Sequence, residues 1–398
     1  MALKLMVGND AVAYAVKLSK PDVISAVPIT PVSPICEKLN QYIADGELGA
    51  KFVEADGEQS VINILMGACA AGCRTFTATT GNGLSWMNDP IYSTPPMRMP
   101  VVMAIGHRSL GILNFWADYT DAMSIRDSGW IQLYVANNQE ALDTVIQAYK
   151  IAEDKRVLLP AMMCFDGWYL SYLSEPVDLP KQEDVDGFLP PFEPEHLTFD
   201  PEKLYWYGAS ELSTQLAMEL RCQLQEAMES AKGVIADVGR EFGEAFGRGY
   251  GLLEGYRSED AELILVTMGS MSETAKDVVD HARERGLPVG IVRVRSFRPF
   301  PGEEIIEATE NAGTLVTLDR CVSTGGNGPL YDEVTSALYN LDDRPMVIGA
   351  YAGVGGRDVT EERLRDLIDH AWKTHRSGRA PEGAVWVGFY GGRENVVI

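Results

Sequence analysis

Residues 22–43, "DVISAVPITPVSPICEKLNQYI", pass from a β-strand to an α-helix through a loop that contains three prolines. The run 22–28 begins as a buried apolar strand, and from Ile35 to Ile43 apolar residues recur every three or four positions, as on one face of a helix. Each proline fixes its own φ angle and biases the preceding residue toward extended backbone, so the loop is rigid. The loop therefore holds one hydroxyl, that of Thr30, at the end of a strand.

The same alternation of strand and helix fills the first 180 residues. Further apolar strands are expected over residues 51–55, 74–79, 100–105, 130–136 and 156–164, and helices over 10–18, 57–72, 138–153 and a few residues after Gly83. Continuous apolar strands between amphipathic helices indicate a parallel sheet that is covered on both faces. Asn9 is the predicted N-cap of the first helix.

The composition changes near residue 180. Residues 180–205 are rich in proline and acidic residues and show no periodicity, which predicts an extended connecting segment over about 180–210. A long helix is expected to follow from about Ser213 to Ala231, with helical pattern continuing to about Phe246.

A second α/β pattern begins at residue 261. Strands are expected over residues 261–270, 287–297, 313–319 and 346–353, and helices over 273–284, 303–311, 329–339 and 360–373. The sequence therefore predicts an α/β protein with two doubly wound parallel-sheet domains, residues 1–250 and 258–375. Residues 376–398 are expected to form a loose tail.

The bulk composition is that of a globular protein with large cores. Apolar residues make up 46% and charged residues 23% of the 398 residues. The formal net charge of −23 argues against a nucleic-acid partner and against an anionic membrane surface. No run of 18 apolar residues and no secretory signal is present, so we expect a cytoplasmic protein without a membrane span.

Six cysteines are scattered along the chain and none forms a C-x-x-C pair. They are Cys36, Cys69, Cys73, Cys164, Cys222 and Cys321. We interpret them as reduced, mostly buried thiols. Iron–sulfur clusters need closely spaced thiolates, so we expect no cluster bound by this chain alone.

Polar residues stand at the carboxyl ends of the predicted strands, where open parallel sheets bind ligands. The Thr30 hydroxyl could donate to a ligand oxygen, or it could satisfy the local backbone. Arg108 offers the two-pronged donor geometry that suits a carboxylate. His107 is a candidate general acid or base, although a lone histidine is more often structural.

Three acidic residues lie between the strand at 51–55 and the next helix. Glu58 stands at the helix start, where the helix dipole favours a carboxylate in any case. Glu54 and Asp56 are its neighbours, and the sequence does not decide which of the three points into the cleft.

Two glycine-rich turns, "TTGNGL" (79–84) and "STGGNGP" (323–329), match neither G-x-G-x-x-G nor a P-loop with its lysine. A Rossmann dinucleotide site and nucleotide hydrolysis are therefore rejected. No G-x-S-x-G nucleophile elbow and no His/Cys cluster is present, which argues against a serine hydrolase and a zinc site. We predict no metal site on this chain.

Several stretches together resemble the α-subunit of the 2-oxoacid:ferredoxin oxidoreductases. They are "PITP" (28–31), "EADGEQSVINILMGACAAGCRTFTATT" (54–80), "PVVMAIGHRSL" (100–110), "DAMSIRDSGWIQLYVANNQEALDTVIQAYKIAEDKRVLLPAMMCFDG" (121–167) and "VRVRSFRPFP" (292–301). The resemblance extends over about residues 8–355. Relatives in this family include pyruvate:ferredoxin oxidoreductase, phenylglyoxylate dehydrogenase and oxalate oxidoreductase.

The resemblance implies a subunit of a thiamine diphosphate enzyme. Its first domain would be the pyrimidine-binding domain and its second the transketolase C-terminal-like domain. The implied reaction is the oxidative decarboxylation of a 2-oxoacid with coenzyme A to an acyl-CoA and carbon dioxide. A β-subunit would carry the diphosphate site, the Mg²⁺ and the nearest [4Fe-4S] cluster. Further partners would be γ and ferredoxin-like δ subunits, in a dimer of the whole assembly.

The resemblance also implies roles for individual residues. Glu58 matches the acid that bonds N1′ of the aminopyrimidine ring and so makes the thiazolium C2 proton easier to remove. Thr30 matches a threonine that contacts the substrate oxygens, and Arg108 an arginine that binds the substrate carboxylate. Gly81 and Asn82 lie in the turn that contacts the cofactor.

This sequence departs from the family pattern at two places. Asn82 replaces a glutamine of the usual T-S-S-Q-G-L turn, and the loop after Arg108 carries Leu113, Phe115 and Trp116. Placed in the substrate site, Phe115 and Trp116 predict a bulky or aromatic 2-oxoacid such as phenylglyoxylate. Alternatively these aromatic side chains pack the core or a subunit interface. Pyruvate is the alternative substrate, while oxalate would need a second cation that the proline loop lacks.

Two other functional classes remain open. One is a non-catalytic assembly subunit with a decayed site, against which the retention of Thr30, Glu58 and Arg108 argues. The other is a self-sufficient transketolase-like enzyme, which would need a G-D-G…N motif for diphosphate and magnesium, and the sequence contains none.

Overall fold

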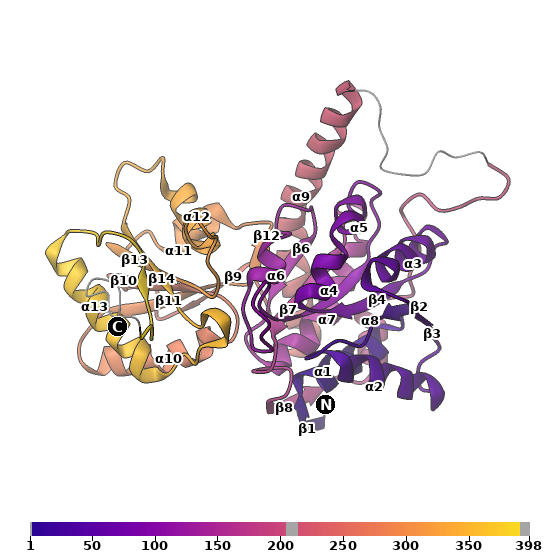
Figure 1. Cartoon of the computed structure of the whole chain (residues 1–398), viewed down its shortest axis with the longest axis horizontal. Helices are drawn as coiled ribbons and strands as arrows, with labels where there is room; N and C mark the ends of the chain where they lie inside the picture. Colours follow the sequence, from indigo (N-terminus) through magenta and orange to yellow (C-terminus); the bar gives the residue numbers. More distant parts are fainter. Residues whose placement is uncertain (1, 204–213, 391–398) are drawn as a thin grey trace.

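The computed structural model describes residues 2–203 and 214–390, which form two α/β bodies (Figure 1). The first body is built on a seven-stranded sheet in the order β12-β6-β7-β5-β4-β2-β3. Its strands are β2 (Val23–Ala26), β3 (Lys51–Glu54), β4 (Thr75–Thr79), β5 (Val102–His107), β6 (Ile131–Tyr134), β7 (Ala161–Asp166) and β12 (Ser296–Arg298). All neighbouring strands are parallel except β12, which runs antiparallel to β6.

Helices cover both faces of this sheet because its strands are apolar on both sides. In β5, Val102 and Ala104 face one core while Met103 and Ile105 face the other. The helices on the first of these faces include α1 (Gly8–Ser19), α2 (Ser33–Ala44), α7 (Asn138–Glu153), α8 (Gln182–Phe188) and α9 (Thr214–Phe246). Those on the second are α3 (Glu58–Ala70), α4 (Gly81–Trp86), α5 (Asn88–Ser93) and α6 (Thr120–Met123).

The second body has a six-stranded sheet in the order β15-β14-β13-β10-β11-β9. Its strands are β9 (Leu253–Tyr256), β10 (Leu263–Thr267), β11 (Val289–Val294), β13 (Thr314–Asp319), β14 (Met346–Tyr351) and β15 (Val385–Trp386). Its helices are α10 (Met271–Glu284), α11 (Gly302–Ala308), α12 (Pro329–Leu338) and α13 (Glu361–Ser377), with a 3₁₀ turn at Val354–Gly356. Only β9 is antiparallel to its neighbour. The predicted α/β class with two doubly wound sheets is confirmed.

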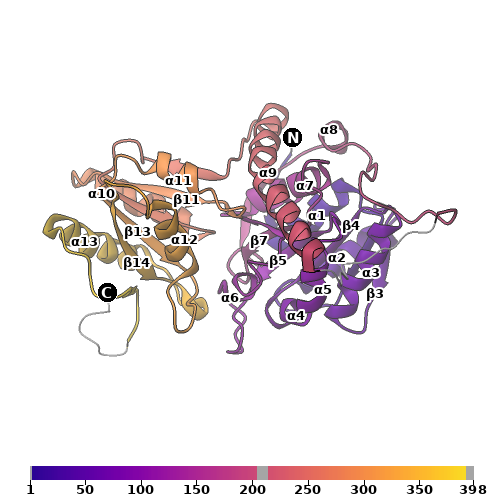
Figure 2. The ribbon, with the colours of Figure 1, turned by 90° about the horizontal axis from the view of Figure 1, so that it is seen from above.

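Helix α9 joins the two bodies. It packs on α7 and α8, and its first turns project beyond the first body (Figures 1 and 2). Across the described ranges, no helix has both the length and the apolar character that a membrane crossing requires.

Several local predictions were wrong. The first helix begins at Gly8, so Asn9 is not its N-cap but lies buried inside it and donates a hydrogen bond to the Pro31 carbonyl at 3.0 Å. An N-terminal strand, β1 (Ala2–Val7), pairs antiparallel with β8 (Ser174–Leu179). The segment 180–205 is not wholly extended, because Val185 and Phe188 reach the core from α8. The tail contributes β15 to the second sheet.

The stretch 287–297, expected as one strand, is divided between the two sheets. Residues of β11 pair within the second sheet, while β12 adds to the edge of the first sheet beside β6. The chain therefore returns to the first body after the second has begun. The division into residues 1–250 and 258–375 remains a prediction.

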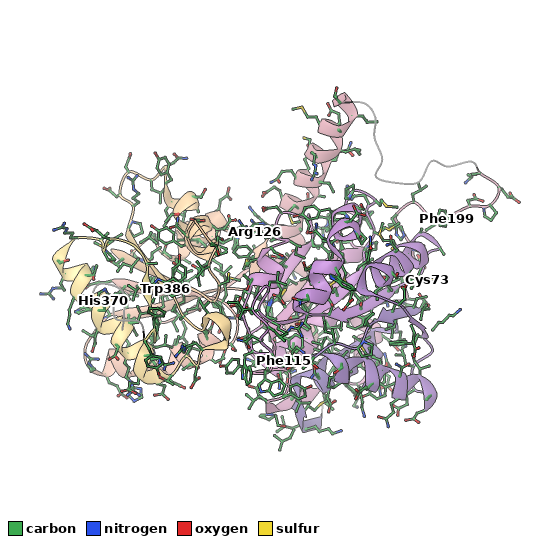
Figure 3. All side chains as sticks on the ribbon, viewed as in Figure 1. Cys73, Phe115, Arg126, Phe199, His370 and Trp386 are labelled. Atoms are coloured by element: carbon green, nitrogen blue, oxygen red, sulfur yellow. The ribbon has the colours of Figure 1, made fainter. Side chains whose placement is uncertain are left out.

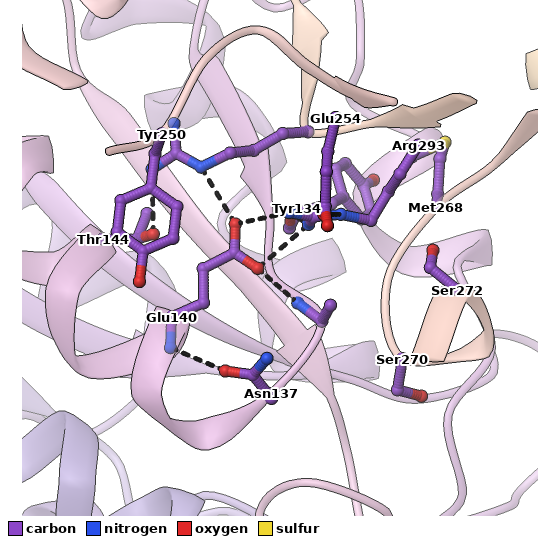
Figure 4. A network of polar contacts seen from close by, with 12 residues as sticks. Tyr134, Asn137, Glu140, Thr144, Tyr250, Glu254, Met268, Ser270, Ser272 and Arg293 are labelled. Atoms are coloured by element: carbon purple, nitrogen blue, oxygen red, sulfur yellow. Dashed lines mark hydrogen bonds and ion pairs between the residues drawn. The ribbon is translucent and has the colours of Figure 1, made fainter. Parts of the chain in front are cut away.

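A buried charge network joins the bodies where β11 ends (Figure 4). The Glu140 carboxylate lies 2.9 Å from Nη1 of Arg293 and 3.0 Å from Nε of Arg295, and all three side chains are at most 5% exposed. Glu254 adds a contact of 2.6 Å to Arg293. Burial would lower the pKa of Arg293, but Glu140 and Glu254 outweigh it, and the pKa is raised. At the fully buried Arg295 the balance is the opposite, because burial outweighs the charge of Glu140 and the pKa is lowered. One carboxylate of the first body thus faces both arginines.

We expect Glu140→Gln to lower the free energy of unfolding by about 3–5 kcal/mol, because it leaves the buried Arg295 guanidinium without a counter-charge and Arg293 with Glu254 alone. Urea unfolding followed by circular dichroism measures this. The control is Asp260→Asn, which removes an acid from an exposed pair with Arg283 and should have a much smaller effect. Equal effects of the two variants would show that the network does not stabilise the fold.

Candidate active site

The three residues predicted at strand ends lie together. Thr30 follows β2, Glu58 begins α3 after β3, and Arg108 follows β5. Nη1 of Arg108 donates to the Thr30 carbonyl at 2.6 Å. The start of α4 fits between the other two: a Cβ added at Gly81 would lie 2.7 Å from Nε of Arg108, and one at Gly83 would lie 2.8 Å from a Glu58 carboxylate oxygen. The structure therefore brings Thr30, Arg108 and Glu58 to one place.

The proline loop is held on three sides. The backbone N–H groups of Val32 and Ser33 both donate to the Ile29 carbonyl at 2.9 Å, and Asn9 binds the Pro31 carbonyl from α1. Val32 packs so closely on Gly106 of β5 that a side chain at position 106 would collide with it. Thr30 is half-buried, and within the described residues its hydroxyl makes no hydrogen bond. Its role as a donor to a ligand stays a prediction.

Arg108 is a buried cation without a paired acid. Its side chain is 6% exposed, its Nε has no hydrogen-bond partner, and in the described part of the chain no carboxylate lies within ion-pair distance. Burial lowers the pKa of Arg108, while the more distant charges of Asp121 and Glu58 act in the opposite direction. An unpaired buried charge is costly, so this arrangement favours an anionic ligand.

Glu58 is the acid that turns inward. It is 8% exposed, whereas Glu54 and Asp56 are both exposed. Its carboxylate accepts no hydrogen bond from the residues that the structure describes, and it faces Gly83 and the unpaired hydroxyl of Thr79. The sequence left open which of the three acids turns inward, and burial identifies it as Glu58.

The other predicted contact residues, Gly81, Asn82, Phe115 and Trp116, differ in burial and in what they contact. Gly81 is buried with φ +45°, in the left-handed region that favours glycine, and Asn82 is exposed. Phe115 lies at the boundary between the two bodies (Figure 3) with its ring 5.7 Å from the Arg108 guanidinium. Trp116 instead stacks near Trp168, at 5.5 Å between ring centroids. Of the two aromatic residues, Phe115 is the one that contacts Arg108.

The loop after Arg108 is attached to the second body. The N–H of Gly355 donates to Asp118 at 2.7 Å, and Asn114 donates to the Gly355 carbonyl. Trp116 lies directly against Gly356, where no side chain would fit. Of the two aromatic residues in this loop, Trp116 packs against the second body and Phe115 packs beside Arg108.

Sequence reasoning missed Asp121, which is fully buried and accepts hydrogen bonds from the backbone of Gly81 and Arg108. No local pattern marks it, because its partners Arg108 and Gly81 lie 13 and 40 positions away in the sequence. His107 is also fully buried, with Nδ1 2.8 Å from Asp121 and its ring 4.6 Å from that of Tyr119. It therefore faces the interior rather than a ligand.

Two protein-family models match this chain, one in each body. Residues 14–240 match the thiamine diphosphate-binding domain of pyruvate flavodoxin/ferredoxin oxidoreductase, and residues 261–364 match core domain II of pyruvate:ferredoxin oxidoreductase. The chain belongs to the 2-oxoacid:ferredoxin oxidoreductase α-subunit family. The predicted resemblance is thereby confirmed.

Relatives align over nearly the whole chain. Pyruvate synthase subunit PorA of Pyrococcus furiosus is 44% identical over 386 residues, covering 97% of both chains. PorA of Methanosarcina barkeri is 45% identical over 375 residues, covering 93% of both. The α-subunit of NADH-dependent phenylglyoxylate dehydrogenase of Aromatoleum evansii is 38% identical over 390 residues, covering 96% of this chain and 93% of that one. The family thus contains subunits of multi-subunit oxidoreductases.

Solved structures agree in fold. A 2-oxoglutarate:ferredoxin oxidoreductase from Magnetococcus marinus superposes with a TM-score of 0.71 at 17% identity, over 93% of this chain and 65% of that longer one. A split gene transketolase superposes with a TM-score of 0.54 at 13% identity, over 92% and 98%. Both likenesses concern the arrangement of sheets and helices.

The residues present fit the aminopyrimidine of thiamine diphosphate, the group that the family binds. A buried carboxylate without a donor stands beside a turn in which two positions leave no room for a Cβ. Glu58 would hold the ring nitrogen, and the absence of a side chain at Gly81 and Gly83 lets Arg108 and Glu58 lie close against this turn.

We expect Gly83→Ala to destabilise the protein by about 1–3 kcal/mol, because the added methyl group would meet Glu58 and Thr79 at under 3 Å. The matched control is Gly67→Ala in α3, where nothing lies within 4 Å of the added atom. That change should stabilise the helix by about 0.5–1 kcal/mol. Thermal unfolding of both variants measures the difference, and a gain in stability for Gly83→Ala would contradict the close approach.

Proposed function

We propose that this chain is the α-subunit of a thiamine diphosphate-dependent 2-oxoacid oxidoreductase that is active only with its β-subunit. The reaction converts a 2-oxoacid anion and coenzyme A into an acyl-CoA, carbon dioxide, a proton and two electrons. The observation that carries the proposal is the buried Arg108 guanidinium, which pairs with no carboxylate in residues 2–203 and 214–390 and lies beside Thr30 and near Glu58. A 2-oxoacid supplies the carboxylate that this site lacks.

The chain's own residues would bind and orient the substrate and the cofactor ring. Arg108 would hold the substrate carboxylate through the N–H groups that remain unpaired, and the Thr30 hydroxyl would donate to a substrate oxygen. Glu58 would accept or donate a proton at the ring nitrogen that it faces. Thiamine diphosphate supplies the carbanion chemistry when bound, and the protein supplies orientation and electrostatics. Holding the substrate at a fixed angle lowers the entropic part of the barrier.

Pyruvate is the substrate that we propose. The relatives at 42–45% identity over nearly the full chain are named as pyruvate synthase subunits, whereas the phenylglyoxylate dehydrogenase subunit is 38% identical. The Phe115 ring already occupies one side of Arg108. An aryl 2-oxoacid such as phenylglyoxylate, the first expectation from the sequence, is the second candidate, because the same partly exposed ring could stack on an aryl group.

The remaining components are assigned to partner subunits, as the resemblance implies. A β-subunit would bring the diphosphate and Mg²⁺ site and the nearest [4Fe-4S] cluster, and γ and ferredoxin-like δ subunits would complete an assembly that forms a dimer. Support comes from the named relatives, which are subunits rather than whole enzymes. Asn82, exposed at the start of α4, would then meet the cofactor from this side.

Purification of the chain alone and of the assembled complex tests the function. We expect no turnover and no tight thiamine diphosphate binding by the isolated chain, and reduction of a viologen dye by the complex with pyruvate and coenzyme A. Phenylglyoxylate, branched-chain 2-oxoacids and 2-oxoglutarate in parallel assays measure the preference. Turnover by the isolated chain would overturn the proposal, and a complex that assembles but oxidises no 2-oxoacid would support a non-catalytic assembly role instead.

In the assembled complex, Arg108→Ala should raise KM for the 2-oxoacid about 10- to 100-fold, since charge-assisted hydrogen bonds contribute about 1.5–3 kcal/mol. The control is Arg98→Ala. Arg98 lies at the opposite end of β5, is partly buried, and binds backbone carbonyls of Val157 and Leu158. Steady-state kinetics should show unchanged KM for that control. An unchanged KM for Arg108→Ala would place the carboxylate elsewhere.

A further inference from the structure

Asp121 is a buried carboxylate with four donors. Its Oδ2 accepts from the backbone N–H of Gly81 and of Arg108, both at 3.0 Å. Its Oδ1 accepts from the N–H of Ala122 and contacts Nδ1 of His107, both at 2.8 Å. A carboxylate offers about four lone-pair positions, so these contacts use all of them.

The four donors come from different elements that meet at the site. Gly81 opens α4 after β4, His107 and Arg108 lie at the end of β5, and Ala122 belongs to α6. The two tips are also linked directly, since Thr80 donates from its hydroxyl to the Gly106 carbonyl. Sheet pairing already holds the ends of β4 and β5 together as far as Thr79 and Ile105. Beyond that pair, the Asp121 side chain joins the backbone of Gly81 to that of Arg108.

The position of the Gly81 backbone relative to Arg108 limits where the Arg108 side chain can lie. The guanidinium passes between Gly81, where a Cβ would lie 2.7 Å from Nε, and the ring of Phe115 at 5.7 Å. A single oxygen of Asp121 binds the backbone N–H groups of both Gly81 and Arg108. A shift of either backbone group therefore changes the space between Gly81 and Phe115 in which the guanidinium lies. The Gly81 turn belongs to the cofactor half of the proposed site and Arg108 to the substrate half.

We propose that Asp121 is a positioning residue that couples the cofactor-contacting turn at Gly81 to the substrate-binding Arg108. The inference rests on the proposed function for the identity of the two halves, whereas the coupling itself rests on the contacts described. Asp121 is buried behind both groups and would touch neither substrate nor cofactor. Its carboxylate also places a negative charge that opposes the effect of burial on the pKa of Arg108.

The test compares Asp121→Ala with Asp118→Ala in the assembled complex. Asp118 is the matched control, because it is also a buried acid, 3% exposed, and lies on the same loop. Its partners are Thr120 and Gly355 and not the residues at the ends of β4 and β5. Hydrogen exchange measured by mass spectrometry should be at least tenfold faster at the amides of Gly81 and Arg108 in Asp121→Ala. In Asp118→Ala the increase should appear at Thr120 and Gly355.

The KM for the 2-oxoacid distinguishes a positioning role of Asp121 from a role in stability alone. A displacement of about 1 Å in a binding group costs on the order of 100-fold, so Asp121→Ala should raise KM for the 2-oxoacid about 10- to 100-fold relative to Asp118→Ala, even at equal thermal stability. If Asp121→Ala does not assemble, Asp121→Asn replaces it. Its amide retains one acceptor oxygen and serves one pair of donors, so we expect a smaller shift in KM.

Three results would overturn the inference. They are exchange at Gly81 and Arg108 that stays as slow as in the wild type, a KM that shifts no more than in the control, and a fall in kcat alone. If the wild-type complex oxidises no 2-oxoacid, the proposed function fails, while the exchange measurement still decides whether Asp121 couples the two tips.

Discussion

Two sets of buried charges are paired across the boundary between the bodies, and the rest of the structure depends on this pairing. Glu140 of α7 faces Arg293 and Arg295, and Asp166 at the end of β7 lies 2.6 Å from Arg320 of the second body. A charge taken out of water without its partner is strongly unfavourable. Because each of these partners is supplied across the boundary, the two bodies have one well-matched way to dock.

The active-site loop inherits its position from that docking. Asp118 receives the N–H of Gly355, and the N–H of Tyr119 donates to the Arg320 carbonyl at 3.4 Å. The same segment continues into α6, where Asp121 binds the tips of β4 and β5. Within residues 258–390 no side chain makes a hydrogen bond or an ion pair with Arg108, yet Gly355 of the second body binds the loop that follows Arg108.

Much of the site could be predicted from the sequence because its residues directly follow apolar strands. Thr30, Glu58 and Arg108 each stand one or a few positions beyond such a run, and parallel strands bring their carboxyl ends to one edge. Asp121 and the crossing of β12 into the first sheet could not be found this way, because both depend on pairing between distant segments. Burial distinguishes Glu58 from Glu54, whereas local pattern treats them alike.

The contrast between satisfied and unsatisfied buried charges is the reason for proposing a ligand at the strand tips. Around Glu140 each guanidinium faces a carboxylate at hydrogen-bond distance, so that network is complete as it stands. At the strand tips Arg108 keeps an unpaired Nε and, among the described residues, Glu58 keeps a carboxylate without a donor, although both are as buried as many core residues. Nearly every buried polar group in a native protein is paired, so groups left open at one place need partners from outside the chain. A carboxylate anion and a ring nitrogen are the two groups that would complete them.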